Sequence, residues 1–276
     1  MRFEKWQALG NDYLILERAD LNAAQVRRLC DPHRGPGADG VLTLHDPETE
    51  GCVARLRIFN PDGSEAELSG NGARQALLYL RRSGWTDRDE LTIETAAGTI
   101  AATLTGEHTA RVDMGRAVLV SKDFPGGPPD GRGTLAAGGA TFAFRHVNVG
   151  NPQCTIRVDD PDSLDLRRYG PEIERNPAFP NRTNVSFWHP TGEDRIRARI
   201  FERGVGETSA SGTGACGAAV AHVLDGGRSP VTVGLDGGEL EVEVAGDLSL
   251  MLTGWAVPVY RGQLSAELGA ELKAIE

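Results

Sequence analysis

Short apolar runs separated by turn residues organise the first hundred residues of the chain. Alternating and β-branched patterns predict strands over Arg2–Trp6, Tyr13–Leu16, Val53–Phe59 and Glu90–Leu104. The last of these runs contains Ala97-Gly98, where we expect a hairpin turn. Helical spacing of apolar residues predicts helices over Ala23–Cys30 and from about Ala73 to Ser83, with Gly84 as the C-cap of the second.

The second half of the chain repeats this alternation. Strand-like segments lie at Ala143–Val149, Asn184–Trp188, Arg195–Phe201 and Val231–Leu235. A helix of small residues is expected from about Gly214 to Leu224. The Gly- and Pro-rich segment Asp123–Gly139 is expected to be a loop, and we place the division between two domains near Met114, at 1–115 and 116–260.

One motif occurs in both halves at matched positions. Glu65–Ala73 and Glu207–Ala215 both read E-x-x-x-S-G-x-G-A, and a strand-like R-x-R-I-F precedes each one. A turn followed by S-G-x-G at a helix start leaves backbone N–H groups free, and glycine lets a ligand approach them closely. Such helix starts bind anions, including carboxylates. The alternative is a duplicated fold whose glycines only pack helix against strand.

Composition narrows the class of protein. The chain has 276 residues, of which 39% are hydrophobic and 25% charged, which is typical of a globular protein of about two domains. Its net charge of −10 and the lack of a long Lys/Arg run argue against nucleic acid as a partner. We find neither a signal-peptide pattern nor a long apolar run, so we expect a cytoplasmic protein without a membrane partner.

Other kinds of site have little support in the sequence. The four cysteines show no C-x-x-C pair, and the six histidines show no H-x-x-H spacing, so we expect reduced thiols and no metal site. The S-G-x-G motif does not match the G-x-S-x-G turn of hydrolases. Cys216 is expected to belong to the core.

The ordered motifs resemble those of the diaminopimelate epimerase family over nearly the whole chain. The matching segments are Leu9–Tyr13, Gly37–Gly40, Phe59–Glu65, Ser69–Arg74, Gly150–Pro152, Asn184, Glu202–Thr208, Ser211–Ala215 and Leu252–Gly254. The resemblance implies an α/β fold of two pseudo-symmetric domains, each a curved mixed β-sheet wrapped around a central helix. It also implies an active site between the domains, a C-terminal strand over about 261–276 returning to the first domain, and a homodimer.

The resemblance also implies a mechanism without pyridoxal or any other cofactor. Two family cysteines transfer the α-proton on opposite faces of an amino acid, and their positions are Ser69 and Ser211 in this chain. Glu202 is the matched base partner of Ser211. Gly70, Gly212 and Thr213 are expected to offer backbone N–H groups to the α-carboxylate. The rest of the expected amino-acid pocket is Asn11, Asn60, Asn71, Asn151, Asn184, Glu202 and Arg203.

This chain departs from the family at the residues that carry the chemistry. Serine replaces both cysteines, and Gln153 stands where the family has a histidine. A serine hydroxyl is a far weaker acid than a thiol, and an amide does not act as a base. Losing an acid/base group typically costs about 10²–10⁴-fold in rate.

Three interpretations follow from these departures. In the first, the chain is a natural epimerase or racemase homologue that keeps the ligand site and either uses serine chemistry or turns over slowly, with LL- and meso-diaminopimelate as the favoured substrates. Alternatively, the serines are engineered replacements that trap a bound substrate. In the third interpretation the chain binds an amino acid without turnover, racemises a different one, or catalyses an elimination that needs one base, which Glu202 supplies.

Overall fold

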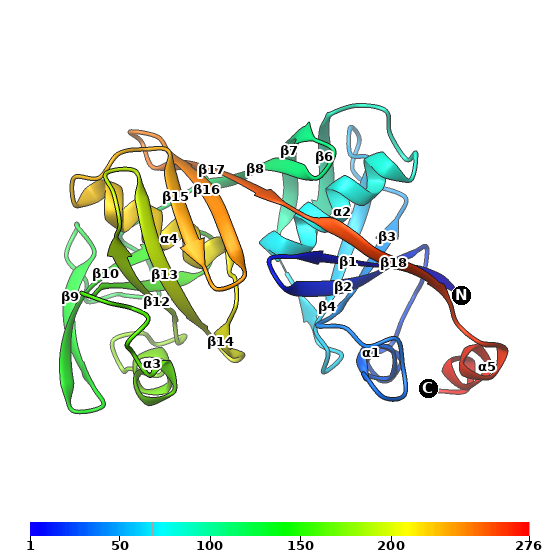
Figure 1. The fold of residues 1–276 in the computed structure, drawn as a ribbon, viewed down its shortest axis with the longest axis horizontal. Coiled ribbons are helices and arrows are strands. Elements are labelled where there is room, and N and C mark those ends of the chain that lie inside the picture. Colours follow the sequence, from blue (N-terminus) through cyan, green and yellow to red (C-terminus); the bar gives the residue numbers. More distant parts are fainter. Residues whose placement is uncertain (68, 276) are drawn as a thin grey trace. The chain divides into compact units, whose positions relative to one another are not determined.

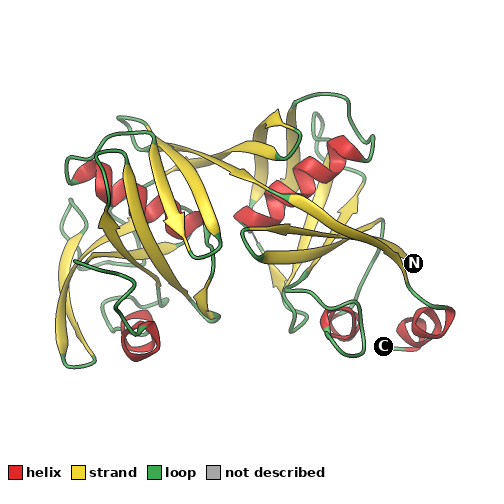
Figure 2. Ribbon diagram, in the orientation of Figure 1, coloured by secondary structure: helices red, strands yellow, loops and turns green. Residues whose placement is uncertain are grey.

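The chain divides into two compact units. The structure is a computed structural model and describes residues 1–67 and 69–275. Unit 1 consists of Met1–Val112 with Gly254–Glu276, and unit 2 of Asp113–Thr253. These divisions lie three and seven residues before those expected at 115/116 and 260/261. Each unit combines a mixed β-sheet with a few helices (Figure 1, Figure 2).

Unit 1 is built on eight main strands in the order β18–β1–β2–β3–β4–β6–β7–β8. The β2–β3 and β4–β6 pairs are parallel, and the others are antiparallel. The strand bounds are β1 Arg2–Ala8, β2 Asn11–Glu17, β3 Val41–His45, β4 Ala54–Phe59, β5 Glu65–Ala66, β6 Glu90–Thr95, β7 Gly98–Gly106, β8 Thr109–Arg116 and β18 Val257–Gln263. The short β5 adds to β4.

Unit 2 repeats this order as β9–β10–β11–β12–β13–β15–β16–β17, with β14 added to β13. Its parallel pairs, β11–β12 and β13–β15, occupy the same places as those of unit 1. The bounds are β9 Arg132–Ala137, β10 Ala140–Asn148, β11 Pro152–Arg157, β12 Asn184–Pro190, β13 Arg195–Glu202, β14 Gly206–Thr208, β15 Val231–Leu235, β16 Gly238–Val244 and β17 Ser249–Trp255.

One long helix packs on the sheet of each unit. In unit 1, α2 (Gly70–Arg82) contacts β1, β2, β3, β4 and β7, and most of its residues are buried. In unit 2, α4 (Gly212–Leu224) contacts β10 to β13, β15 and β16. The expected fold class is therefore confirmed for each unit: a mixed sheet packs around a central helix (Figure 2).

Smaller helices complete the two cores. α1 (Ala23–Cys30) has the bounds expected from sequence, because Asn22 and Gln25 form a capping box at its start. α1 packs Val26 and Leu29 against apolar residues of β2 and β3. In unit 2, α3 (Leu166–Glu174) buries Leu166 and Ile173 in a phenylalanine-rich cluster.

The expectation of a C-terminal strand over 261–276 is wrong for most of that range. The strand that pairs with β1 is β18, which ends at Gln263, and α5 (Ala266–Ala274) follows it. Ser265 caps the helix by accepting the N–H of Leu268 at 3.1 Å, and the Ala, Leu, Glu and Lys residues that follow favour helix. β18 holds in unit 1 the place that β9 holds in unit 2.

Three other expected elements need correction. The segment Asp123–Gly139 is not all loop, since β9 lies within it and pairs with β10. The hairpin turn falls at Ala96–Ala97, because Thr95 pairs with Gly98. The long helices also begin earlier than expected, at Gly70 and Gly212, because each serine cap starts the helix within the glycine motif itself.

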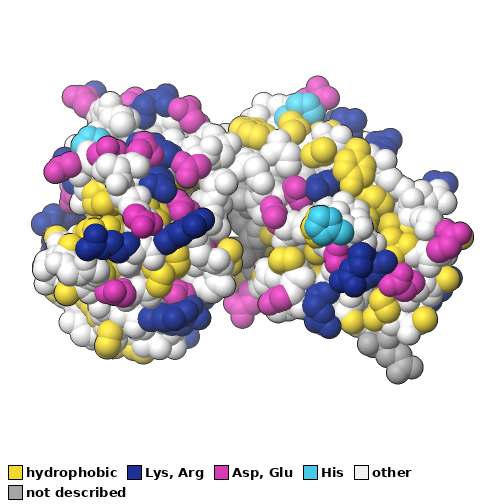
Figure 3. All heavy atoms as spheres, turned by 60° about the horizontal axis from the view of Figure 1, so that its bottom comes forward, with side chains coloured by type: hydrophobic (Ala, Val, Ile, Leu, Met, Phe, Trp, Pro, Cys, Tyr) yellow, Lys and Arg dark blue, Asp and Glu magenta, His cyan; other side chains and the backbone are white. Residues whose placement is uncertain are grey.

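The surface carries both signs of charge. On the face drawn in Figure 3, basic and acidic side chains are interspersed over each unit. Among residues 1–67 and 69–275, no helix is both long and apolar enough to cross a membrane.

Two candidate half-sites at helix N-termini

The first candidate half-site lies at the start of α2 in unit 1. Ser69 is the N-cap residue, with φ −136° and ψ 118°, and its Oγ accepts the N–H of Gly72 at 3.0 Å. The hydroxyl of Tyr13, on β2, donates to the same Oγ at 3.3 Å. The Ser69 hydroxyl is thus held between a helix N-terminus and a phenol.

The second half-site repeats this arrangement at the start of α4. Ser211 caps the helix with φ −139° and ψ 122°, and its Oγ accepts the N–H of Gly214 at 3.2 Å. Its partner is different, because Ser211 donates to Oε2 of Glu202, at the end of β13, at 3.2 Å. A base activates serine when its carboxylate accepts a hydrogen bond from the serine hydroxyl, and Ser211 and Glu202 have this arrangement.

The environment of Glu202 favours that role. Burial raises the pKa of the Glu202 carboxyl above its usual range, and the hydrogen bond from Ser211 opposes the shift. A carboxylate with a raised pKa holds a proton more firmly than an exposed one. It is therefore a better general base near neutral pH.

Asn151, Gln153 and Thr213 form one hydrogen-bonded group beside Ser211. The Nε2 of Gln153 donates to Oδ1 of Asn151 at 2.6 Å and to Oγ1 of Thr213 at 3.2 Å. Asn151 Nδ2 also donates to Oγ1 of Thr213 at 3.2 Å. Because Thr213 accepts both bonds, its own hydroxyl proton is free to point to a ligand. Gln153 therefore links two expected substrate-binding residues and has no acid/base group of its own.

Asn184 and Arg203 meet at the turn that follows β13. Asn184 accepts the Arg203 backbone N–H at 2.9 Å and donates to the carbonyl of Pro152 at 3.0 Å. Glu174 holds the same turn by accepting the N–H of Gly204 at 2.8 Å and a bond from Arg182. The Arg203 side chain is exposed and donates to the carbonyl of Asn181. Both ends of the Asn184 amide are thus occupied by main chain.

The expected asparagines of unit 1 are more dispersed. Asn11 Nδ2 donates to Asp39 at 3.2 Å, and Asn60 Nδ2 donates to the Ser64 hydroxyl at 3.0 Å within the turn after β4. Asn71 lies in the first turn of α2, as Gly70 does, and accepts a bond from Arg74. Of these residues, Gly70 directly follows Ser69 in the chain, and Asn71 is the next residue.

Sequence reasoning assigned no role to two residues of the first half-site. Tyr13 contacts Ser69, and the fully buried Arg74 binds the carbonyl of Gly70 and the side chain of Asn71. Both lie inside segments that match the family, and this match was the only indication in the sequence that they belong to the site. A contact between β2 and the start of α2 depends on the tertiary fold, so the motif alone could not reveal it.

A separate hollow of about 530 Å³ lies within unit 2, at the other end of α4. It is lined by residues of β9 to β12 and by Ala221 and Asp225, where the helix ends. Asp225, the C-cap residue of α4, binds Arg145 at 2.8 Å and Arg132 at 3.2 Å, which places two cations near the C-terminus of the helix. No cluster of three or more potential metal ligands occurs within the described part of the chain.

Solved structures share this fold at low sequence identity. A phenazine biosynthesis protein of the PhzF family from Bacillus anthracis matches with a TM-score of 0.67 and 20% identity, covering 96% of this chain and 99% of its own. A probable proline racemase from Agrobacterium radiobacter matches with a TM-score of 0.65 and 18% identity, covering 96% and 93%. The fold thus defines a class of duplicated α/β proteins that includes several chemistries.

Sequence relatives are more specific. The family model described as diaminopimelate epimerase matches residues 3–120 and 145–259. A diaminopimelate epimerase from Pelotomaculum thermopropionicum is 40% identical over 279 residues, covering 95% of this chain and 98% of its own. One from a Synechocystis strain is 41% identical over 275 residues, with the same coverage. The chain belongs to the diaminopimelate epimerase family.

Proposed function

We propose that the chain is a cofactor-independent isomerase that interconverts LL- and meso-diaminopimelate, in the pathway to lysine and peptidoglycan precursors. Membership of the family supports the substrate. One observation carries the chemistry: Ser211, at the start of α4, donates a hydrogen bond to Glu202. Burial raises the pKa of the Glu202 carboxyl. The matching serine cap at α2 supports a second proton-transfer group.

In this proposal the helix starts bind the α-carboxylate of the substrate. The N–H groups of Gly70, Gly212 and Thr213 lie in the first turns of α2 and α4, where backbone donors favour an anion. The polar groups that recognise the rest of the amino acid are Asn11, Asn60, Asn71, Asn151 and Arg203. We assign Asn184 a positioning role, because its amide holds Arg203 and Pro152.

Proton transfer then uses the two half-sites in turn. Ser211 passes its hydroxyl proton to Glu202 as its Oγ takes the α-proton, and the electron pair of the broken C–H bond moves into the bound carboxylate. Ser69 gives its hydroxyl proton to the opposite face of the carbanion. Tyr13, 3.3 Å from Ser69, returns a proton to the Ser69 oxygen and recovers one from water. Glu202 then releases to solvent the proton that it took from Ser211, which balances the proton taken up by Tyr13, so the cycle closes without a cofactor.

A second candidate function is one-base chemistry on an amino acid. The two half-sites are unequal, since Ser211 faces a carboxylate whereas Ser69 faces a phenol. An elimination or a proton exchange with retention needs only the Ser211–Glu202 half-site. If neither half-site transfers a proton, the protein binds the amino acid without turnover.

The direct test is conversion of LL-diaminopimelate to the meso form, followed by chiral chromatography. We expect slow conversion by the protein itself and faster conversion by Ser69→Cys/Ser211→Cys, because a thiolate forms far more readily than an alkoxide. Ser69→Ala/Ser211→Ala is the matched control and should be inactive. If the cysteine variant binds the substrate yet forms no meso product, the proposed reaction is wrong.

We further propose that the protein is a cytoplasmic homodimer. Four free thiols, three of them buried, suit a reducing compartment. β18 pairs with β1 and exposes Val259 by 53% and Tyr260 by 42%, which makes this strand a candidate subunit contact. Sedimentation should give a dimer that Tyr260→Asp weakens. A monomer at micromolar concentration would contradict the dimer.

A further inference from the structure

A very short strand precedes each capping serine. β5 pairs with β4 at two positions, Ile58 with Ala66 and Phe59 with Glu65. β14 pairs with β13 at three positions, from Ile200 with Thr208 to Glu202 with Gly206. Each serine follows the end of its short strand by three residues. Strands this short are weakly held by their own ladder, so a further anchor would complement the helix cap that already holds each serine.

Unit 1 supplies such an anchor in an ion pair, the first clamp, formed by Arg57 and Glu65. Arg57 on β4 donates from Nε and Nη2 to the two carboxylate oxygens of Glu65, both at 2.9 Å. This bidentate geometry fixes orientation as well as distance. The Arg57 hydrogen bond lowers the pKa of the Glu65 carboxyl, so the pair stays charged at neutral pH. The Arg57 guanidinium also lies over the Phe59 ring, 4.9 Å from its centroid.

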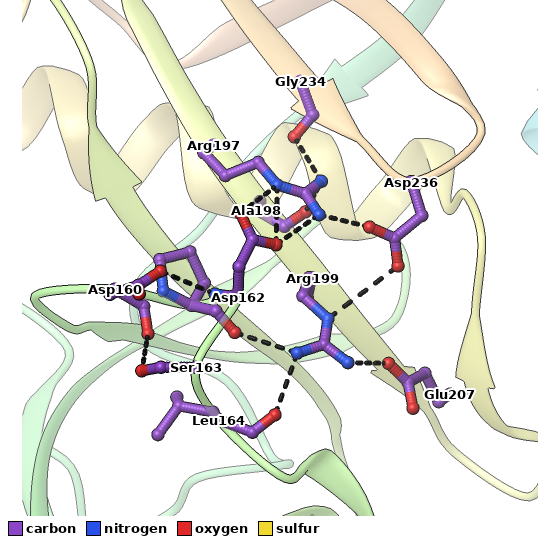
Figure 4. Close-up of polar contacts among 11 residues, drawn as sticks. Asp160, Asp162, Ser163, Leu164, Arg197, Ala198, Arg199, Glu207, Gly234 and Asp236 are labelled. Carbon is purple, nitrogen blue, oxygen red and sulfur yellow. Dashed lines mark hydrogen bonds and ion pairs between the residues drawn. The ribbon is translucent and has the colours of Figure 1, made fainter.

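Unit 2 has the same pair, the second clamp, formed by Arg199 and Glu207 (Figure 4). Arg199 also donates to the carbonyls of Pro161 at 3.0 Å and Leu164 at 2.8 Å, and its Nε lies 3.8 Å from Asp236. Its side chain is 16% exposed, against 32% for Arg57. The second clamp is thus the more enclosed of the two and is screened less by solvent.

The clamps share one position relative to the serines. Glu65 and Glu207 each stand four residues before the capping serine, and each arginine stands two residues before the Phe at the matched place on β4 or β13. Residues 66–68 and 208–210, which bridge glutamate and serine, differ at every position. The backbone angles of Ser69 and Ser211 still agree within a few degrees. The clamp and the glycine motif, rather than the bridging residues, are what the two half-sites share.

We propose that Glu65 and Glu207 are positioning residues that, held by Arg57 and Arg199, fix the capping serines for proton transfer. The significance for catalysis rests on the proposed function, in which the serines transfer the protons. In unit 2 the consequence is direct. Arg199 lies three residues before Glu202 on β13, so the second clamp ties the strand that carries the base to the segment that carries Ser211.

A thiol reporter tests the first clamp without any assay of epimerisation. Ser69→Cys is made in a Cys52→Ser background, which leaves Cys30, Cys154 and Cys216, all buried, as slow competitors. The pH dependence of alkylation by iodoacetamide gives the pKa of the thiol introduced by Ser69→Cys. A thiol held at a helix N-terminus should have a pKa below the ordinary value of about 8.5.

Adding Glu65→Gln then separates positioning from simple electrostatics. Loss of position should raise the thiol pKa by about one unit toward its ordinary value. Removal of a nearby negative charge alone would lower it. The exchanged pair Arg57→Glu/Glu65→Arg should restore the low value. A thiol pKa that stays the same or falls with Glu65→Gln, in a protein of unchanged circular dichroism, would overturn the proposal.

The second clamp is tested in the Ser69→Cys/Ser211→Cys protein by Glu207→Gln. We expect kcat to fall about 10- to 100-fold with little change in KM, because the reacting groups are misplaced while binding groups remain. Asp162→Asn is the matched control, since Asp162 binds the neighbouring Arg197 instead. Equal losses in both variants would contradict the second clamp. If the thiol experiment succeeds and no variant epimerises, the proposed function fails and the positioning role stands.

Discussion

At the residue scale, each capping serine combines two tasks that compete for its oxygen. Ser211 accepts the N–H of Gly214 to cap α4 and donates its proton to Glu202. Capping stabilises the helix by about 1 kcal/mol and fixes where the oxygen lies. It also places the oxygen at the positive end of the helix dipole, where developing negative charge is favoured. Stability and proposed chemistry thus depend on one atom in each unit.

The burial that raises the pKa of Glu202 should also lower the free energy of unfolding at neutral pH. Its pKa is raised in the folded protein, so the folded state binds the proton more tightly than the unfolded state. The free energy of unfolding therefore falls as the pH rises from the ordinary pKa of about 4.3 through the raised value. We expect Glu202→Gln to be more stable than the parent at pH 7, with a gain that shrinks toward pH 4.3. Urea denaturation at both pH values measures it, and a gain independent of pH would contradict the assignment.

At the element scale, helices and strands were predicted correctly where a capping motif or an apolar pattern in the local sequence defines them. α1 was predicted with its observed bounds from its helical spacing, and β15 from its β-branched run. α3 was missed because Pro171 interrupts the pattern, and β9 because its neighbours are glycines and its pairing with β10 is the main evidence for it. Propensity was overridden at the start of α2 and α4, where glycines occupy helical positions.

Two helical glycines should respond oppositely to the same substitution. A Cβ on Gly269 in α5 would meet nothing within 4 Å, so Gly269→Ala should stabilise the protein by about 0.5–1 kcal/mol. A Cβ on Gly217 in α4 would lie 3.0 Å from Cβ and Cγ of the buried Gln153. Gly217→Ala should therefore destabilise by about 1–3 kcal/mol. Thermal unfolding of the two variants checks the pair, and a stabilising Gly217→Ala would contradict the packing described for Gln153.

At the scale of the whole molecule, the chain is a duplication whose two copies have diverged in chemistry. The pairing order and both parallel pairs recur, and β18 takes in unit 1 the place of β9 in unit 2. The repeated motif revealed this from sequence, because strand, glutamate, serine and glycines recur in order. Two contacts distinguish the copies. Tyr13 and Ser69 lie 56 residues apart, and their contact was not expected. Glu202 and Ser211 lie nine residues apart, and their pairing was expected through the family resemblance.

The most direct test of the account is deuterium incorporation at the α-carbon of LL- and meso-diaminopimelate in heavy water. We predict that the protein exchanges the α-hydrogen that faces the Ser211–Glu202 half-site faster than it inverts the centre, because Ser69 is the weaker partner. Exchange should rise with pH as Glu202 loses its proton. If neither isomer gains deuterium between about pH 6 and 10, in this protein and in Ser69→Cys/Ser211→Cys, the account of two proton-transfer half-sites is contradicted.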